Sequence, residues 1–214
     1  AEAPANSAAG ALVRPGAEIA AHLDAAAPGM SPKVVGLIKR AVKTMKAGDH
    51  PKAARLALKA LDAAPDAAIT NHVMALCLYE LGRLSTALTF YERAWKIDPK
   101  NPDIYLNLGQ TAWKLDMLEA AEKFFRIYMQ LAPKRVDAAI NLGGVLRDQG
   151  HYSESVEILR AAIYAAPDSA YLWNALGATL VESGDITQAK TFYSEALRLR
   201  PDFARSHHNL AQVH

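Results

Sequence analysis

Three asparagines recur in register along the 214-residue chain. The interval from Asn141 to Asn209 is twice the interval from Asn107 to Asn141, and each asparagine is followed by a leucine and then by glycine or alanine. A carboxamide both donates and accepts hydrogen bonds, so a row of them can bind the backbone of an extended peptide whatever its side chains. The chemistry that this spacing indicates is reversible binding.

The other candidate chemistry is weak. The sequence shows no Ser/His/Asp or Cys/His set and no paired acidic site beyond the residues that recur at regular intervals along the chain. Gly143-Gly144 follows no expected strand, so it is not a phosphate loop. His207 and His214 fall at core positions of an expected helix, which favours packing over metal binding. We therefore expect no catalytic residue, no metal and no cofactor in these residues, and a segment that is not itself an enzyme.

The elements that position the asparagines follow from five evenly spaced prolines: Pro65, Pro99, Pro133, Pro167 and Pro201. A proline cannot continue the helix that precedes it. Between the prolines the same residue types recur, most clearly in one copy: Trp173, Leu176, Gly177, Leu180, Gly184, Ala189, Tyr193, Ala196 and Pro201. Small residues allow paired helices to approach closely. At the turn between the two helices of each copy stands Gly48, Gly82, Gly150 or Gly184, since glycine readily adopts the positive φ that such a turn can require. In the third copy this position is Asp116, a polar turn former.

This pattern resembles that of the tetratricopeptide-repeat (TPR) family, with Leu180 in place of the usual Tyr and Tyr193 in place of the usual Phe. The resemblance implies an all-α, right-handed TPR superhelix over residues 31–214. It would hold five full repeats (34–67, 68–101, 102–135, 136–169 and 170–203) and part of a sixth (204–214). Residues 1–30 are rich in Ala and Pro and are predicted to be a leader or linker with one short helix near residues 17–25.

Helical geometry predicts which side chains line the concave groove. Positions 2, 6, 9 and 13 of each first helix point away from the core. The predicted polar groove residues are Asp103, Asn107, Gln110, Lys114, Asn141, Asp148, Asn209 and Gln212. Repeat five departs from the row, with Ala175 at position 6 and Asn174 one residue earlier.

The row is similar to the asparagine ladder in the TPR region of O-GlcNAc-transferase-like and SPINDLY-like glycosyltransferases, some of whose bacterial relatives modify flagellins. The resemblance implies a client protein or peptide in the groove, a catalytic domain elsewhere in the same chain, and flagellin as one candidate client. Two alternatives stay open. Asparagine is tolerated on this helix face in many repeats. The second reading of the whole chain is a stand-alone adaptor that scaffolds a cell-envelope or secretion assembly.

The first two repeats predict a different surface. Val35, Ile69, Val73 and Leu76 put apolar side chains on the expected concave face, next to Tyr79. An exposed apolar stripe marks a partner site and suits the apolar face of an amphipathic helix. Alternatively, residues 1–30, with Leu12, Val13, Ile19 and Leu23, fold back over the stripe.

Composition limits the class of protein further. Repeat 34–67 has seven basic and three acidic side chains, a net +4 in a chain of net +2. A basic end can bind an anionic partner or RNA, but no aromatic residues interleave with these lysines, which favours a solvated terminal repeat and no nucleic acid. Cys77 is the single cysteine, so no intramolecular disulfide forms, and no apolar run predicts a membrane span. We expect a cytoplasmic protein, or a periplasmic one if residue 1 follows a cleaved signal peptide.

Overall fold

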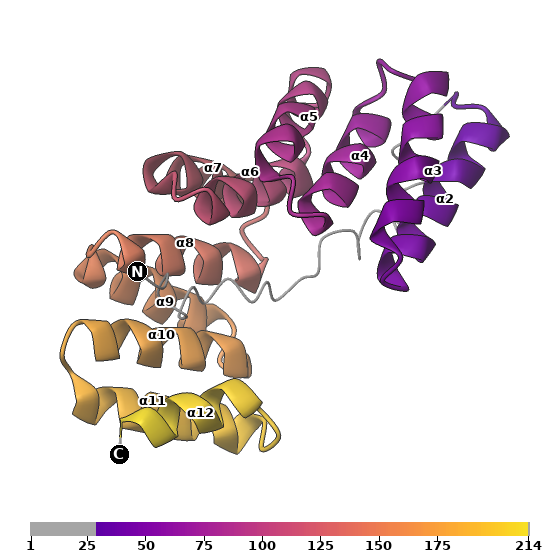
Figure 1. Ribbon diagram of the computed structural model, residues 1–214. Coiled ribbons are helices and arrows are strands. Elements are labelled where there is room, and N and C mark those ends of the chain that lie inside the picture. The colour runs from indigo at the N-terminus through magenta and orange to yellow at the C-terminus, as the bar shows by residue number, and fades with distance from the viewer. Residues whose placement is uncertain (1–28, 214) are drawn as a thin grey trace, which may run out of the picture. The chain divides into compact units, whose positions relative to one another are not determined.

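The computed structural model describes residues 29–213, where every regular element is an α-helix (Figure 1). In chain order these are α2 (Pro32–Lys46), α3 (His50–Ala63), α4 (Ala68–Glu80), α5 (Leu84–Ile97), α6 (Pro102–Lys114), α7 (Leu118–Leu131), α8 (Val136–Asp148), α9 (Tyr152–Ala165), α10 (Ala170–Glu182), α11 (Ile186–Leu199) and α12 (Ala204–Gln212). The leader predicted for residues 1–30, its short helix and its folding back all rest on residues 1–28, which lie outside the described residues.

The helix starts repeat with the period of the sequence. From α4 to α10 each first helix begins at the same point of its repeat, and the second helices α5, α7, α9 and α11 do the same. Ser31 and Asn101 cap helix N-termini with side-chain oxygens, and a proline follows each of them in the first turn. The turns have the predicted backbone: φ is positive at the four turn glycines and is 60° at Asp116. The predicted all-α solenoid class is confirmed.

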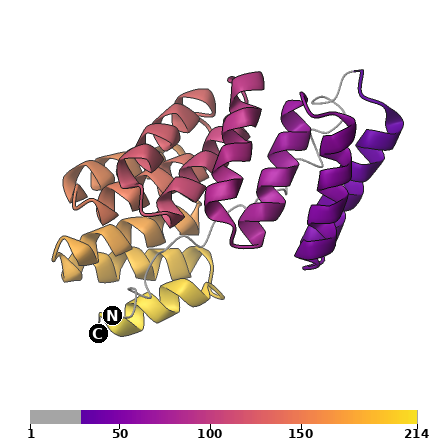
Figure 2. The ribbon, with the colours of Figure 1, turned by 45° about the horizontal axis from the view of Figure 1, so that its top comes forward.

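Contacts divide the described chain into two units within α7, residues 29–124 and residues 125–213. In the first unit, α2 pairs with α3 and α4 pairs with α5 (Figures 1 and 2). The helix pairs meet at small residues, since Ala53, Ala60, Ala87 and Ala94 are fully buried. The core of this unit extends from α2 through α4 to Leu108 of α6.

In the second unit, α10 packs against α8, α9, α11 and α12. Two glycines are required by close packing. A Cβ at Gly177 would lie 2.6 Å from the Tyr193 ring, and one at Gly143 would lie 2.9 Å from Leu159. Ser155 is buried opposite Gly143, donates a hydrogen bond of 2.8 Å to its carbonyl oxygen and lies 3.0 Å from the Thr179 hydroxyl. These contacts hold the first helices α8 and α10 against the second helices α9 and α11.

Candidate functional site

Asn107 is buried near the middle of α6 and is held by two hydrogen bonds. Its Nδ2 donates to the carbonyl oxygen of Asp103, one turn earlier, at 2.8 Å. The same nitrogen lies 2.7 Å from Nε2 of His72 on α4. Both amide hydrogens are therefore used inside the first unit, and the Oδ1 atom is the part of the carboxamide that remains for a ligand.

His72 is a partner that the sequence analysis did not find. The ring is buried, its edge faces the Tyr91 ring at a centroid distance of 5.6 Å, and burial lowers its pKa from 6.5 to about 4. The imidazole is therefore neutral near pH 7, and its Nε2 accepts the hydrogen bond from Asn107. One indication of this partner was present in the sequence. His72 directly precedes Val73, which occupies in repeat two the groove position that Asn107 occupies in repeat three.

Three more predicted groove residues lie on α6. Asp103 is half-buried in its first turn, and Gln110 is buried one turn beyond Asn107. No described residue hydrogen-bonds to the buried Oε1 of Gln110. The Lys114 ammonium lies 4.2 Å from the centre of the Tyr79 ring, a cation–π contact between α6 and α4. The Gln110 oxygen has almost no solvent-accessible area, and an unsatisfied buried acceptor is costly.

Asn141 on α8 repeats the local geometry of Asn107. It is buried and its Nδ2 donates to the Asp137 carbonyl oxygen at 2.8 Å. No other described residue hydrogen-bonds to this side chain, which leaves Oδ1 and one amide hydrogen for a ligand. Asp148, at the end of α8, accepts from the Arg147 guanidinium at 2.8 Å.

The structure brings Asn174 of α10 and Asn209 of α12 together. Nδ2 of Asn209 donates to Oδ1 of Asn174 at 3.2 Å, and the Ser206 hydroxyl donates to the same oxygen at 3.0 Å. The offset of one residue in repeat five therefore does not separate these two carboxamides. Gln212 is exposed at the end of α12. Sequence reasoning missed Ser206, whose only signal was a small polar residue three positions before Asn209.

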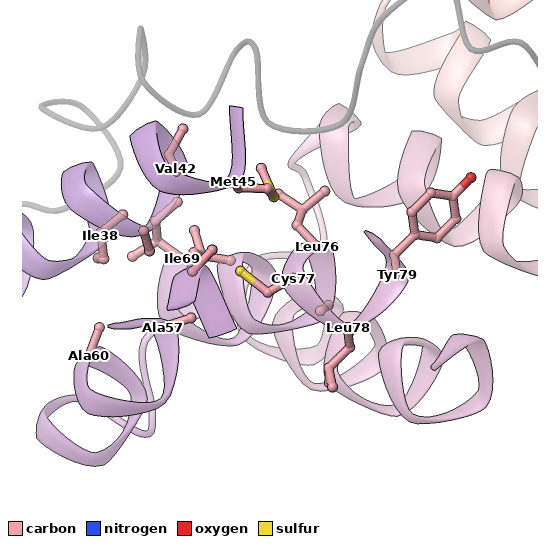
Figure 3. Packing of buried hydrophobic residues seen from close by; sticks show 14 of the residues in the cluster. Ile38, Val42, Met45, Ala57, Ala60, Ile69, Leu76, Cys77, Leu78 and Tyr79 are labelled. Carbon is pink, nitrogen blue, oxygen red and sulfur yellow. The ribbon is translucent and has the colours of Figure 1, made fainter. Parts of the chain in front are cut away.

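The apolar stripe is not an open surface. Ile69, Val73 and Leu76 are 7%, 1% and 0% exposed and belong to the core of the first unit. Tyr79 is buried and Val35 is half-buried. Figure 3 shows Ile69 and Leu76 in one cluster with side chains from α2. The expected exposure is wrong for Ile69, Val73, Leu76 and Tyr79, because α4 packs against α2 and α3 as well as against α5. Their contact with a partner stays a prediction.

Within residues 29–213, no group of three or more His, Cys, Asp or Glu side chains is placed to hold a metal ion. No helix in the same range has both the length and the apolar character that crossing a bilayer demands.

Models of the TPR repeat match residues 76–116, 106–170 and 170–203, so the matches run without a gap over residues 76–203. Protein FlbA of Caulobacter vibrioides is 36% identical over 174 residues, which are 81% of this chain and 29% of that protein. The chain thus spans less than a third of this relative's length.

Solved structures show the same fold. MamA from Desulfovibrio magneticus RS-1 has a TM-score of 0.72 at 17% identity, over 82% of this chain and 99% of that one. The thermophilic TPR protein TTC0263 of Thermus thermophilus has a TM-score of 0.69 at 18% identity, over 84% and 98%. YrrB, described as a TPR protein with an unusual peptide-binding site, has a TM-score of 0.65 at 20% identity, over 80% and 89%.

Three observations indicate the same repeat family: the even spacing of the prolines, the paired helices with glycine at their turns, and the matching family models. The chain is a tetratricopeptide-repeat protein.

Proposed function

We propose that the chain binds an extended segment of a client protein through carboxamides on the first helices of its repeats. The observation that carries this proposal is the hydrogen bond from Asn209 to Asn174, which joins carboxamides of α10 and α12 in the second unit. Asn141 adds a third carboxamide from α8, the helix that packs on the other side of α10. We call Asn141, Asn174 and Asn209 the carboxamide surface.

The hydrogen bonds on this surface leave groups that match a peptide backbone. Asn141 keeps an acceptor oxygen and one amide hydrogen, so it can pair with both an N–H and a C=O of a bound chain. Its bond to the Asp137 carbonyl fixes the side chain in advance, which lowers the entropy lost when a peptide binds. Because the backbone is common to all sequences, recognition of this kind suits several clients.

In the first unit, the same role falls to Asn107 and Gln110. The oxygen of Asn107 has no described partner, and the buried oxygen of Gln110 is unsatisfied. The Asn107 oxygen, and the Gln110 oxygen once its side chain turns outward, would accept hydrogen bonds from backbone N–H groups of the client. The exposed Lys114 ammonium would donate to a carboxylate of the client. The hydrogen bond from Asn107 to His72 makes this part of the proposal dependent on a neutral imidazole.

Two larger roles are compatible with client binding. The asparagine row resembles the acceptor-binding ladder of O-GlcNAc-transferase-like glycosyltransferases, which supports a substrate-recognition region of a protein glycosyltransferase, with flagellin as one candidate client. The other role is a stand-alone adaptor. Sugar transfer onto a bound client, measured with the natural full-length protein, separates the two, since an adaptor retains the client unmodified.

The experiment for client binding uses peptides selected from a phage-displayed library on the immobilised 214-residue chain. Their affinities are then measured for wild type, for the double variant Asn141→Ala/Asn209→Ala, and for Gln130→Ala on the exposed side of α7 as the matched control. At about 1 kcal/mol per hydrogen bond, the double variant should weaken binding by roughly tenfold or more. Unchanged affinity in a folded double variant would refute the proposal.

A further inference from the structure

The first described helix, α2, has an unusual charge. Pro32–Lys46 contains five basic side chains and no acidic one, and all five are exposed: Lys33, Lys39, Arg40, Lys43 and Lys46. By contrast, residues 68–214 have 15 basic and 16 acidic side chains. The positive charge of the chain is therefore concentrated at this end of the first unit.

The charges replace core residues of the later repeats. The positions equivalent to Arg40 are all apolar: Leu108, Leu142 and Leu176 are fully buried, and Met74 and Leu210 are half-buried. The positions equivalent to Lys43 are occupied by residues that are also buried: Cys77, Thr111, Val145 and Thr179. A terminal repeat needs a polar outer face for solubility, but mixed charges meet that need. A face of one sign requires a further explanation.

The like charges repel one another along the helix. Lys39 and Lys43 are four residues apart, and Lys43 is three residues from both Arg40 and Lys46, which are the spacings at which like charges destabilise a helix. Among residues 29–213, no carboxylate forms an ion pair with Arg40, Lys43 or Lys46.

The acid that follows α2 has a different role. Asp49 caps α3 by accepting from the backbone N–H of Lys52 at 3.0 Å. Lys43 and Lys46 lie in the last turn of α2, where the helix dipole favours cations, but Lys33, Lys39 and Arg40 lie outside that turn. Carboxylates supplied from outside the described chain would offset the remaining repulsion.

We propose that the exposed face of α2 is a docking surface for an acidic segment of a protein partner. The helix extends over about 20 Å, so its cations can pair with a row of carboxylates. A membrane is a poorer fit, because the apolar side of α2, with Val34, Ile38 and Val42, is buried in the core and is not available for insertion. Single-stranded RNA is also a poorer fit, because α2 has no aromatic side chain on which bases can stack.

The test measures binding of a fluorescein-labelled peptide, matched in length to α2 and with glutamate at every second position, by fluorescence anisotropy. The same peptide with glutamine in place of glutamate is the ligand control. The protein variants are Arg40→Glu/Lys43→Glu and the matched control Lys100→Glu/Lys123→Glu, whose two lysines are exposed elsewhere. Both double variants change the net charge by the same amount. Circular dichroism of each variant confirms that it is folded.

We expect the glutamate peptide to bind wild type and the Lys100/Lys123 variant alike, and the Arg40/Lys43 variant to lose affinity by about tenfold or more. Binding should weaken severalfold when NaCl is raised from about 50 mM to about 300 mM. Equal losses in both double variants would show an effect of net charge alone and overturn the proposal. A glutamine peptide that binds as tightly as the glutamate peptide, or tighter binding of an RNA of equal length or of phosphatidylserine vesicles, would also overturn it. The Asn141→Ala/Asn209→Ala variant should keep the difference in affinity between the glutamate peptide and the glutamine peptide.

Discussion

Protonation of His72 should destabilise the first unit at mildly acidic pH. Burial lowers the pKa of the folded His72 ring from 6.5 to about 4, so as the pH falls the unfolded chain binds this proton first. The stability that depends on the neutral ring is complete above the unfolded pKa of 6.5 and is lost as the pH falls towards 4. Protonation also removes the acceptor that holds Asn107, since a charged imidazole has only donors.

The size of the effect follows from the two pKa values. A fall from 6.5 to about 4 corresponds to about 3 kcal/mol between the high-pH and low-pH limits. At about pH 5 the unfolded ring is almost fully protonated and the folded ring is mostly neutral, so about 2 kcal/mol of the unfolding free energy should be lost relative to about pH 7.5. The pKa of the ring is the quantity that sets this difference.

The assay is urea unfolding at the two pH values, followed by tryptophan fluorescence in a Trp173→Phe background. The two remaining tryptophans, Trp95 and Trp113, both lie in the first unit, so the signal reports on that unit. The control is His72→Gln, whose carbonyl oxygen can still accept from Asn107 but does not titrate. Other titrating groups affect both proteins equally. The reasoning is refuted if wild type and His72→Gln lose the same free energy between the two pH values.

Three further predictions concern packing. Gly177→Ala should lower the free energy of unfolding by about 1–3 kcal/mol, because its Cβ would lie 2.6 Å from a buried tyrosine ring. Gly36→Ala, where the space is open, should raise the free energy of unfolding slightly. Calorimetry that ranks the two variants in the opposite order would contradict the account. Val73→Asp should lower the melting temperature strongly, since the site is 1% exposed, whereas Leu58→Asp at a 46% exposed site should change the melting temperature little. Equal melting temperatures of the two variants would refute the assigned burial. Burial raises the pKa of Cys77 to about 12, so the native thiol should not react with a chromogenic disulfide reagent at about pH 8 and should react fully in urea.

The local features of the fold could be predicted from the sequence. A proline at the end of each repeat and a glycine at four turns specify where helices end, because both residues act through their own backbone. Asp116 is the instructive case, since it was expected to replace glycine at its turn and does adopt a positive φ of 60°. Helix starts and turns depend on nearest neighbours in the chain, which the sequence shows directly.

The candidate site was less predictable because its contacts join different repeats. Helical periodicity placed Ile69, Val73 and Leu76 on an open face, but their burial depends on how α4 packs against α2. The contact between His72 and Asn107 joins residues 35 positions apart, and the contact between Asn174 and Asn209 spans the same separation. A repeat alignment treats Asn174 as out of register, whereas the structure shows that one residue of offset still allows the side chains to meet.

The most direct test of the account is an NMR titration that observes the asparagine side chains. Protein labelled with nitrogen-15 at asparagine is titrated with a library-selected peptide, and Asn→Ala variants assign the side-chain amide signals. The account predicts that the Asn141 and Asn209 side-chain signals shift as the peptide binds, while the signal of Asn101, which caps α6, stays unchanged. A peptide that saturates the protein and leaves the Asn141 and Asn209 side-chain signals unchanged would contradict binding through the carboxamide surface.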